Sequence, residues 1–142
     1  MTTSAAVVAC ALALLGRPMH NMPTLTFLEQ PPPGTSPNAE AFVGRNPDTI
    51  YLITSSAVFR DAMRVRSMYE DINVFRKIAS IIVHEEWHLK HGPDEQGAYY
   101  AQLTMLSALG ARPELITTVR KSMFAAVAEQ KRRRPELLMV AK

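Results

Sequence analysis

The sequence predicts a mainly helical α+β fold in a single domain of 142 residues. Short runs of β-branched and aromatic residues lie between positions 25 and 54, whereas the chain beyond Ser55 has the periodicity of amphipathic helices. Glycine and proline divide this helical part at Gly92-Pro93, and again at Gly110 and Pro113. We therefore expect a small sheet followed by helices that are joined by short turns.

Residues 1–18 are expected to form an N-terminal helix. The apolar run Ala5–Leu15 has no lysine or arginine before it, and Gly16-Arg17-Pro18 is a poor cleavage site, so an export signal is not favoured. The run is also far shorter than the ~20 residues that a membrane-spanning helix needs. We expect a buried or amphipathic helix, ended by Gly16 and Pro18, and no membrane span.

Three short segments are the strand candidates. A proline-rich loop over Gln30–Asn38 separates the first two, and a turn over residues 44–48 precedes the third, which has the strongest strand signal. We expect a small antiparallel sheet with a hairpin. The strands are expected over Leu25–Leu28, Ala41–Val43 and Thr49–Thr54.

Four helices are expected to follow the sheet. In the longest, the apolar residues form one stripe, and His84, His88 and His91 lie directly beside that stripe. The helices are expected over 55–65, 68–91, 94–109 and 113–130, and residues 131–142 are expected to form a basic tail. The apolar stripe consists of Val74, Phe75, Ile78, Ile81, Ile82 and Leu89.

Composition limits the classes of function. Apolar residues make up 47% and charged residues 20%, which is typical of a globular protein, and the net charge of +3 does not by itself indicate a nucleic-acid partner. The single cysteine, Cys10, excludes an intrachain disulfide and fits a reducing compartment, so a cytoplasmic location is favoured over export. With no cysteine cluster, a metal site must use histidine and carboxylate.

Residues 84–88 read His-Glu-Glu-Trp-His, a match to the HExxH motif. Positions i and i+4 lie one above the other on a helix, so His84 and His88 can bind one ion. Glu85 stands beside them, where it could take a proton from a metal-bound water that attacks a carbonyl. This pattern is typical of a single-zinc site, with Zn²⁺ as the expected cofactor.

Three residues after His88 are candidates for the third ligand. His91 lies seven residues beyond His84, which is about 10 Å along the helix axis, and is too far for the same ion. Asp94 has the spacing of HExxHxxGxxH/D peptidases, but the glycine of that motif is displaced by one residue. The Gly-Pro turn places Glu95 opposite the last turn of the first helix, so Glu95 is favoured, and Asp94 remains the alternative or caps the second helix.

Neighbouring residues have weaker functional signals. Glu86 is expected in solvent, Trp87 is expected to pack on a neighbouring element, and His91 is expected at the rim of the pocket. Tyr99 is the better candidate, ahead of Tyr100, for a hydrogen-bond donor to a tetrahedral oxyanion, although ordinary packing is favoured over that role. The strand over 49–54 could be an edge strand that aligns an extended peptide, and a purely structural strand explains it equally well.

At these residues the sequence resembles the gluzincin group of zinc peptidases, in which a glutamate from a second helix completes the site. The segment Glu95–Ala101 is also similar to the ExxA(N)xxA segment of ImmA/IrrE-type peptidases. The stretch Ile81–Leu109 looks like a group of small bacterial zincin-like proteins. The resemblance implies a zinc site on a zincin-like helix pair, namely the HExxH helix and the glutamate helix, but it supplies no substrate.

The function expected from the sequence is zinc-dependent hydrolysis of peptide bonds in a peptide or protein substrate. Zinc is assigned to His84, His88 and Glu95, the general base to Glu85, and a supporting catalytic role to Tyr99. The alternative is a zinc-stabilised regulatory or binding domain without turnover, which would not depend on Glu85. A nucleic-acid partner at the basic tail is not favoured.

Overall fold

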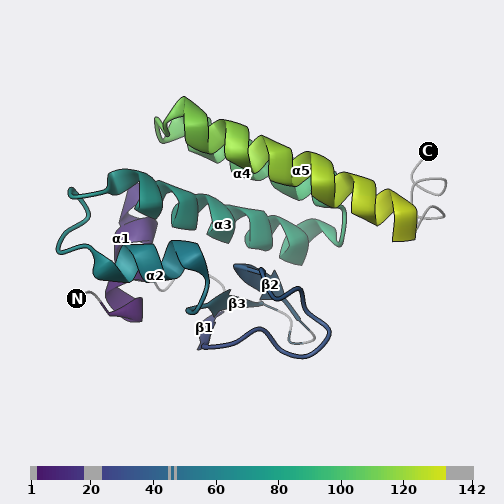
Figure 1. Ribbon diagram of the computed structural model, residues 1–142, viewed down its shortest axis with the longest axis horizontal. Coiled ribbons are helices and arrows are strands. Elements are labelled where there is room, and N and C mark those ends of the chain that lie inside the picture. The colour runs from purple at the N-terminus through teal and green to yellow at the C-terminus, as the bar shows by residue number, and fades with distance from the viewer. Residues whose placement is uncertain (1–2, 18–23, 45, 47, 134–142) are drawn as a thin grey trace.

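The computed structural model describes residues 3–17, 24–44, 46 and 48–133. Their architecture confirms the mainly helical α+β class (Figure 1). The elements, in chain order, are α1 (Ser4–Leu14), β1 (Thr24–Leu28), β2 (Ala41–Val43), β3 (Thr49–Ile53), α2 (Ala57–Arg64), α3 (Ile72–His91), α4 (Glu95–Ala108) and α5 (Pro113–Arg133).

Helix α3 is the central element of the fold. It packs against α1, α2 and the sheet on one side and against α4 on the other (Figure 1). Its predicted apolar stripe faces the core, because Phe75, Ile78, Ile81 and Ile82 are buried while Val74 and Leu89 are partly buried against them. The helix that carries the HExxH motif is therefore anchored along its length by apolar contacts.

Helix α1 belongs to the same core. Four of its residues are almost completely buried and pack with the apolar residues of α3, which confirms a buried N-terminal helix. Pro18, which was expected to help end this helix, lies outside the described residues. Among the described helices, none combines the length and the apolar character needed to cross a bilayer. The buried residues are Val7, Val8, Ala11 and Leu12.

The sheet is mixed, so the prediction of an antiparallel sheet is wrong for one of its two strand pairs. Its order is β1-β3-β2, in which β2 and β3 are antiparallel but β1 and β3 are parallel. The most apolar strand takes the middle position, where Ile50, Leu52 and Ile53 are buried. The connection over residues 29–40 carries the chain to the far edge of β3, which places β2 on the side away from β1.

The β2–β3 hairpin confirms the predicted hairpin, and it aligns Ala41 with Leu52 and Val43 with Ile50. Two residues of the turn predicted between its strands, Arg45 and Pro47, lie outside the described residues.

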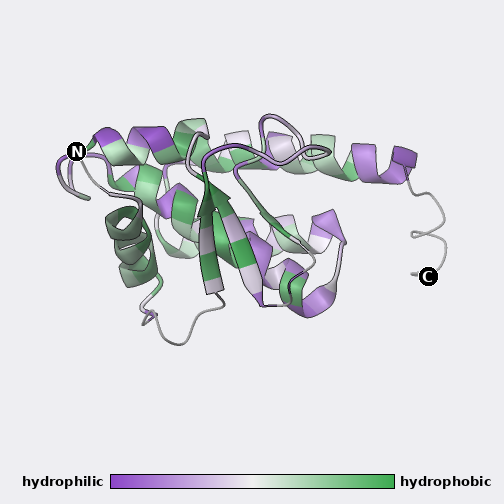
Figure 2. Ribbon diagram, turned by 90° about the horizontal axis from the view of Figure 1, so that it is seen from below, coloured by the Kyte–Doolittle hydropathy of each residue, from purple (hydrophilic) through white to green (hydrophobic). Residues whose placement is uncertain are grey.

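Helices α4 and α5 form a second apolar cluster with the turn that joins them. Leu106, Ala111 and Val119 form its buried centre. Helix α5 continues to Arg133, so residues 131–133, expected to begin the tail, form its last turn instead. Glu129 pairs there with Arg132 and Arg133, and positive charge is favourable at a helix C-terminus. Figure 2 shows this polar helix end, and the remainder of the expected tail, 134–142, lies outside the described residues.

Candidate metal centre

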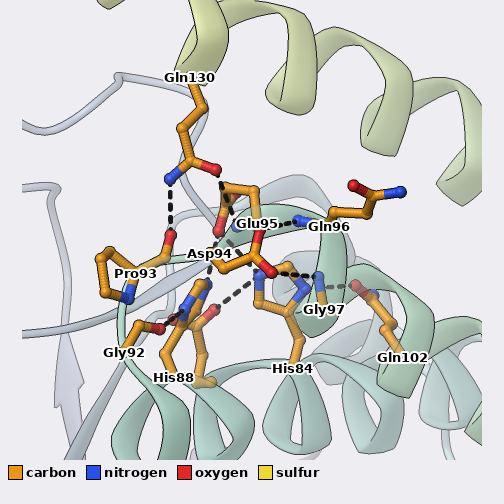
Figure 3. A network of polar contacts seen from close by, with 11 residues as sticks. His84, His88, Gly92, Pro93, Asp94, Glu95, Gln96, Gly97, Gln102 and Gln130 are labelled. Atoms are coloured by element: carbon orange, nitrogen blue, oxygen red, sulfur yellow. Dashed lines mark hydrogen bonds and ion pairs between the residues drawn. The ribbon is translucent and has the colours of Figure 1, made fainter. Parts of the chain in front are cut away.

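The structure brings together the three side chains that the sequence nominates as metal ligands. His84 and His88 project from α3, and Glu95 is the first residue of α4 (Figure 3). Glu95 Oε1 lies 2.5 Å from His88 Nε2 and 3.6 Å from His84 Nε2. One ligand atom from each residue lies within 4.8 Å of the other two, so the three could hold one ion.

The two other candidate ligands have different positions. Asp94 caps α4, since its carboxylate accepts hydrogen bonds from the backbone N–H groups of Gln96 and Gly97 at 3.2 and 3.3 Å. His91 is exposed, and its ring lies against Trp87 with 4.7 Å between the centroids, because positions i and i+4 share one strip of a helix. His91, which was expected at the pocket rim, is not among the residues that line the pocket described below.

Gly92 sets the orientation of His88. Its backbone has φ +96° and ψ −161°, a conformation that only glycine adopts readily, and it ends α3. In this conformation the Gly92 carbonyl accepts a hydrogen bond from His88 Nδ1 at 2.8 Å. Because Nδ1 is used as the donor to this carbonyl, the Nε2 side of the ring is turned toward Glu95.

Trp87 and Gly97 set the distance between α3 and α4. The indole ring lies so close to Gly97 that a Cβ atom at that position would overlap it. This contact confirms that Trp87 packs on a neighbouring element. The glycine therefore lets the glutamate helix approach the histidine helix closely enough for Glu95 to reach both imidazoles.

Two glutamines that the sequence analysis did not single out hold the site from neighbouring helices. Gln102 of α4 contacts His84 Nδ1 through Oε1 at 2.8 Å. Gln130 of α5 accepts a hydrogen bond from the Glu95 N–H at 3.0 Å and donates one to the Pro93 carbonyl at 2.7 Å (Figure 3). Position 102 could have been found, because it lies seven residues after Glu95, on the same strip of α4. Gln130 has no comparable signal.

Glu85 is a nearly buried carboxylate beside the two histidines, with 7% of its surface exposed. Burial raises its pKa, and the nearby His84 and His88 oppose that shift only in part. Within the described residues its one close polar contact is His84 Nε2, at 3.7 Å. Among the described residues, Glu85 therefore has no hydrogen-bond partner, and a purely structural role would not account for burying this carboxylate.

Glu95 and His88 form a charged pair in the absence of metal. Burial would raise the pKa of Glu95, but the two imidazoles outweigh burial and hold it at about 2. Burial likewise lowers the pKa of His88, but its contacts with Glu95 and with the Gly92 carbonyl raise it above the ordinary value. The pair shows that this space favours positive charge next to Glu95.

Tyr99 lies against His84, one of the candidate metal ligands. Its ring stands edge-on to that of His84, with 4.5 Å between the centroids. Burial, with a further contribution from the charge of Glu95, raises the pKa of Tyr99 to about 12, so its hydroxyl stays protonated at neutral pH. Tyr100, the weaker candidate, is exposed and lies close to Gln96 on the outer side of α4.

A pocket of about 760 Å³ opens onto these residues. The segment from Glu40 to Val43 and the face of α5 that carries Ser122 and Ala126 form part of its lining, together with α3 and α4. Glu40 is paired with Lys77 at 2.9 Å. The prediction of an edge strand over 49–54 is wrong, because β3 is central; the edge strand beside the pocket is β2.

Glu86 corrects another prediction, since it is not in solvent. Only 12% of its side chain is exposed, and both carboxylate oxygens contact Arg17 Nη1, at 2.7 and 2.8 Å. The residue faces away from the apolar stripe, as the helix periodicity requires, but Arg17, which follows α1, covers its carboxylate on that side of α3.

The donor set fits zinc. Two imidazoles and one carboxylate are ligand types that zinc takes in proteins, and three protein ligands would leave a fourth position for water or substrate. Comparisons of the chain with protein-family models, curated proteins and solved structures found no match.

Proposed function

We propose that this protein is a zinc-dependent peptidase in which His84, His88 and Glu95 hold the metal and Glu85 is the general base. The observation that supports this most strongly is the position of Glu85, which is almost buried and lines the pocket beside the ligands. A buried carboxylate with a structural role is normally hydrogen-bonded. Burial without such a partner is instead typical of a group that exchanges protons with a substrate.

Zinc bound here supplies a Lewis acid for a substrate carbonyl and lowers the pKa of water. Glu85 accepts a proton from the attacking water as the water oxygen bonds to the carbonyl carbon. The same carboxyl then gives the proton to the leaving nitrogen while the carbon–nitrogen bond breaks. The raised pKa of Glu85 suits the first step, because it makes the carboxylate a stronger base than an exposed glutamate.

Tyr99 donates a hydrogen bond to the carbonyl oxygen as negative charge develops on it. Its high pKa keeps the phenol protonated for this role, and its contact with His84 places the ring beside the ligands. The phenol is expected to contribute to the rate without contributing to metal binding.

The substrate is a peptide or a protein segment in extended conformation. The edge strand β2 lines the pocket, and its outer backbone groups can pair with an extended chain. The opposite wall, on α5, carries small side chains, including Ser122, Ala125 and Ala126, that leave room for a substrate's side chains.

The test compares wild type with Glu85→Gln in two measurements, zinc content by elemental mass spectrometry and cleavage of a mixed peptide library followed by mass spectrometry. We expect one zinc per chain in both proteins and cleavage by the wild type alone. Zinc in both proteins, with no cleavage by either, would favour a zinc-stabilised binding domain. An absence of zinc from wild type that had been offered the metal would overturn the proposal.

A further inference from the structure

Gln102 and Ser80 form, with His84, a buried polar chain between α3 and α4. The structure describes four buried polar or charged residues, and three of them belong to this chain: Ser80, His84 and Gln102 are 0%, 7% and 4% exposed. A polar group in such a place is costly unless each donor meets an acceptor.

The direction of every hydrogen bond in this chain follows from its last member. The chain ends on the backbone carbonyl of Lys77, which can only accept, so the Ser80 hydroxyl must donate to it at 2.7 Å. Ser80 Oγ then accepts from Gln102 Nε2 at 3.2 Å. This leaves Gln102 Oε1 facing His84 Nδ1 at 2.8 Å, and that nitrogen must carry the proton.

The reverse orientation of the Gln102 amide is disfavoured. It would place Oε1 against Ser80 Oγ, whose hydrogen is already donated to Lys77, and Nε2 against His84 Nδ1. One hydrogen bond would then lack a donor, among side chains that are almost completely buried. Ser80 therefore fixes the amide, and the amide fixes the imidazole.

We propose that Gln102, locked by Ser80, is a positioning residue that holds His84 as the Nδ1–H tautomer and so presents its Nε2 lone pair to the candidate metal centre. This inference rests on the proposed metal site for its function, but the tautomer itself can be measured without metal. His84 thereby matches His88, whose Nδ1 donates to the Gly92 carbonyl. The difference is that His84 depends on a side chain of another helix.

The experiment measures the tautomer of His84 in metal-free protein at alkaline pH, using long-range ¹H–¹⁵N spectra of the imidazoles. Wild type is expected to show Nδ1–H at His84. Gln102→Leu, which removes the acceptor at similar volume, should shift His84 toward Nε2–H, and Ser80→Ala should do so to a smaller extent. Gln102→Glu keeps an acceptor at this position and should restore Nδ1–H.

Zinc affinity, measured by competition with a chelator, is the second readout. Gln102→Leu is expected to bind zinc roughly 10–100-fold more weakly, which is the usual effect of losing such an outer partner. The matched control is Leu103→Ala, which alters the neighbouring, partly buried residue in the α4–α5 cluster and should change neither the tautomer nor the affinity.

The two readouts separate the possible failures. Nε2–H at His84 in the wild type, or an unchanged tautomer in folded Gln102→Leu, would overturn the positioning role. If Gln102→Leu does not fold, Ser80→Ala decides in the same way. A wild type with the expected tautomer but without zinc affinity would support the hydrogen-bond chain and overturn only the proposed function.

Discussion

His84 and Glu95 point into the same space, but the protein holds them in different ways. His84 lies in the middle of α3, its side chain is 9% exposed, and a buried side-chain hydrogen bond fixes its ring. Glu95 is the first residue of α4, its side chain is 28% exposed, and Gln130 holds its backbone. The histidine half of the site, on α3, is thus part of the hydrophobic core. The position of the glutamate half, Glu95 on α4, depends on how α4 and α5 pack against that core.

The largest effect is expected at the third ligand. Glu95→Ala removes the only carboxylate in the cluster of possible ligands, so zinc affinity should fall by more than the roughly 10–100-fold that an outer partner costs. Asp94→Ala is the matched control, since it removes only the helix cap, at about 1 kcal/mol of stability, and should keep the zinc. Metal titration and thermal unfolding would check both, and zinc loss in Asp94→Ala alone would reverse the assignment.

A smaller effect, on stability and on zinc binding, is expected at the contact between α3 and α4. Gly97→Ala places a methyl group against the indole ring of Trp87, and overpacking of this kind costs about 1–3 kcal/mol. The gain of up to about 1 kcal/mol in helix propensity offsets only part of this cost. Urea unfolding should therefore show a less stable protein, and α4 pushed away from α3 should bind zinc more weakly.

Trp87→Leu supplies the control for that contact. In its background, Gly97→Ala should be neutral or stabilising, because the overlap is gone while the gain in helix propensity remains. Equal destabilisation in both backgrounds would show that the close approach of the helices has another cause.

Gln130 of α5 should influence zinc binding less than Gln102 and Ser80, whose hydrogen bonds fix His84. Gln130→Ala removes two hydrogen bonds at a partly exposed position, where water can replace them, so we expect a loss of about 0.5–1.5 kcal/mol in zinc binding. Lys131→Ala, an exposed neighbour, is the control. Calorimetric titration would measure zinc binding by both variants. A loss of affinity in Gln130→Ala larger than that in Gln102→Leu would contradict the expectation that the support of His84 matters more than the support of Glu95.

The smallest effect is expected in the acid stability of the metal-free protein. The pKa of Glu95 is held at about 2, against an ordinary value of 4.5, so its carboxylate stabilises the fold above about pH 4.5. That contribution is lost as the pH falls from about 4.5 toward about 2. In Glu95→Gln, the free energy of unfolding should fall less steeply over this window. The difference should be small, because solvent screens the partly exposed carboxyl, and parallel curves would contradict it.

The comparison of His84 with Glu95 also explains which features of the fold and the site could be predicted from the sequence. The HExxH spacing, the apolar stripe and the Gly-Pro turn are local patterns, and they predicted α3, the turn and the position of Glu95 beside the histidines. The parallel pairing of β1 with β3 depends on where the connection over 29–40 crosses, which no local pattern encodes. Glu86 was misjudged for a similar reason, because its cover by Arg17 comes from a distant part of the chain.

The glutamines show a second limit. Gln102 and Gln130 act through direct hydrogen bonds, but a lone glutamine in a helix is usually solvated, so the residue type alone indicates neither. The seven-residue spacing from Glu95 is the one sequence signal, and it indicates Gln102 only. Only the packing of α4 on α3, and of α5 on α4, gives these residues partners.

The place of Trp87 has a practical consequence. It is the only tryptophan in the chain, and it lies between the backbone of Gly97 and the rings of His88 and His91, with centroid distances of 5.9 and 4.7 Å to the two imidazoles. Its fluorescence is therefore a built-in optical reporter of the seam between the two helices. Emission that responds to added zinc would follow assembly of the site in real time, without a label and without a known substrate.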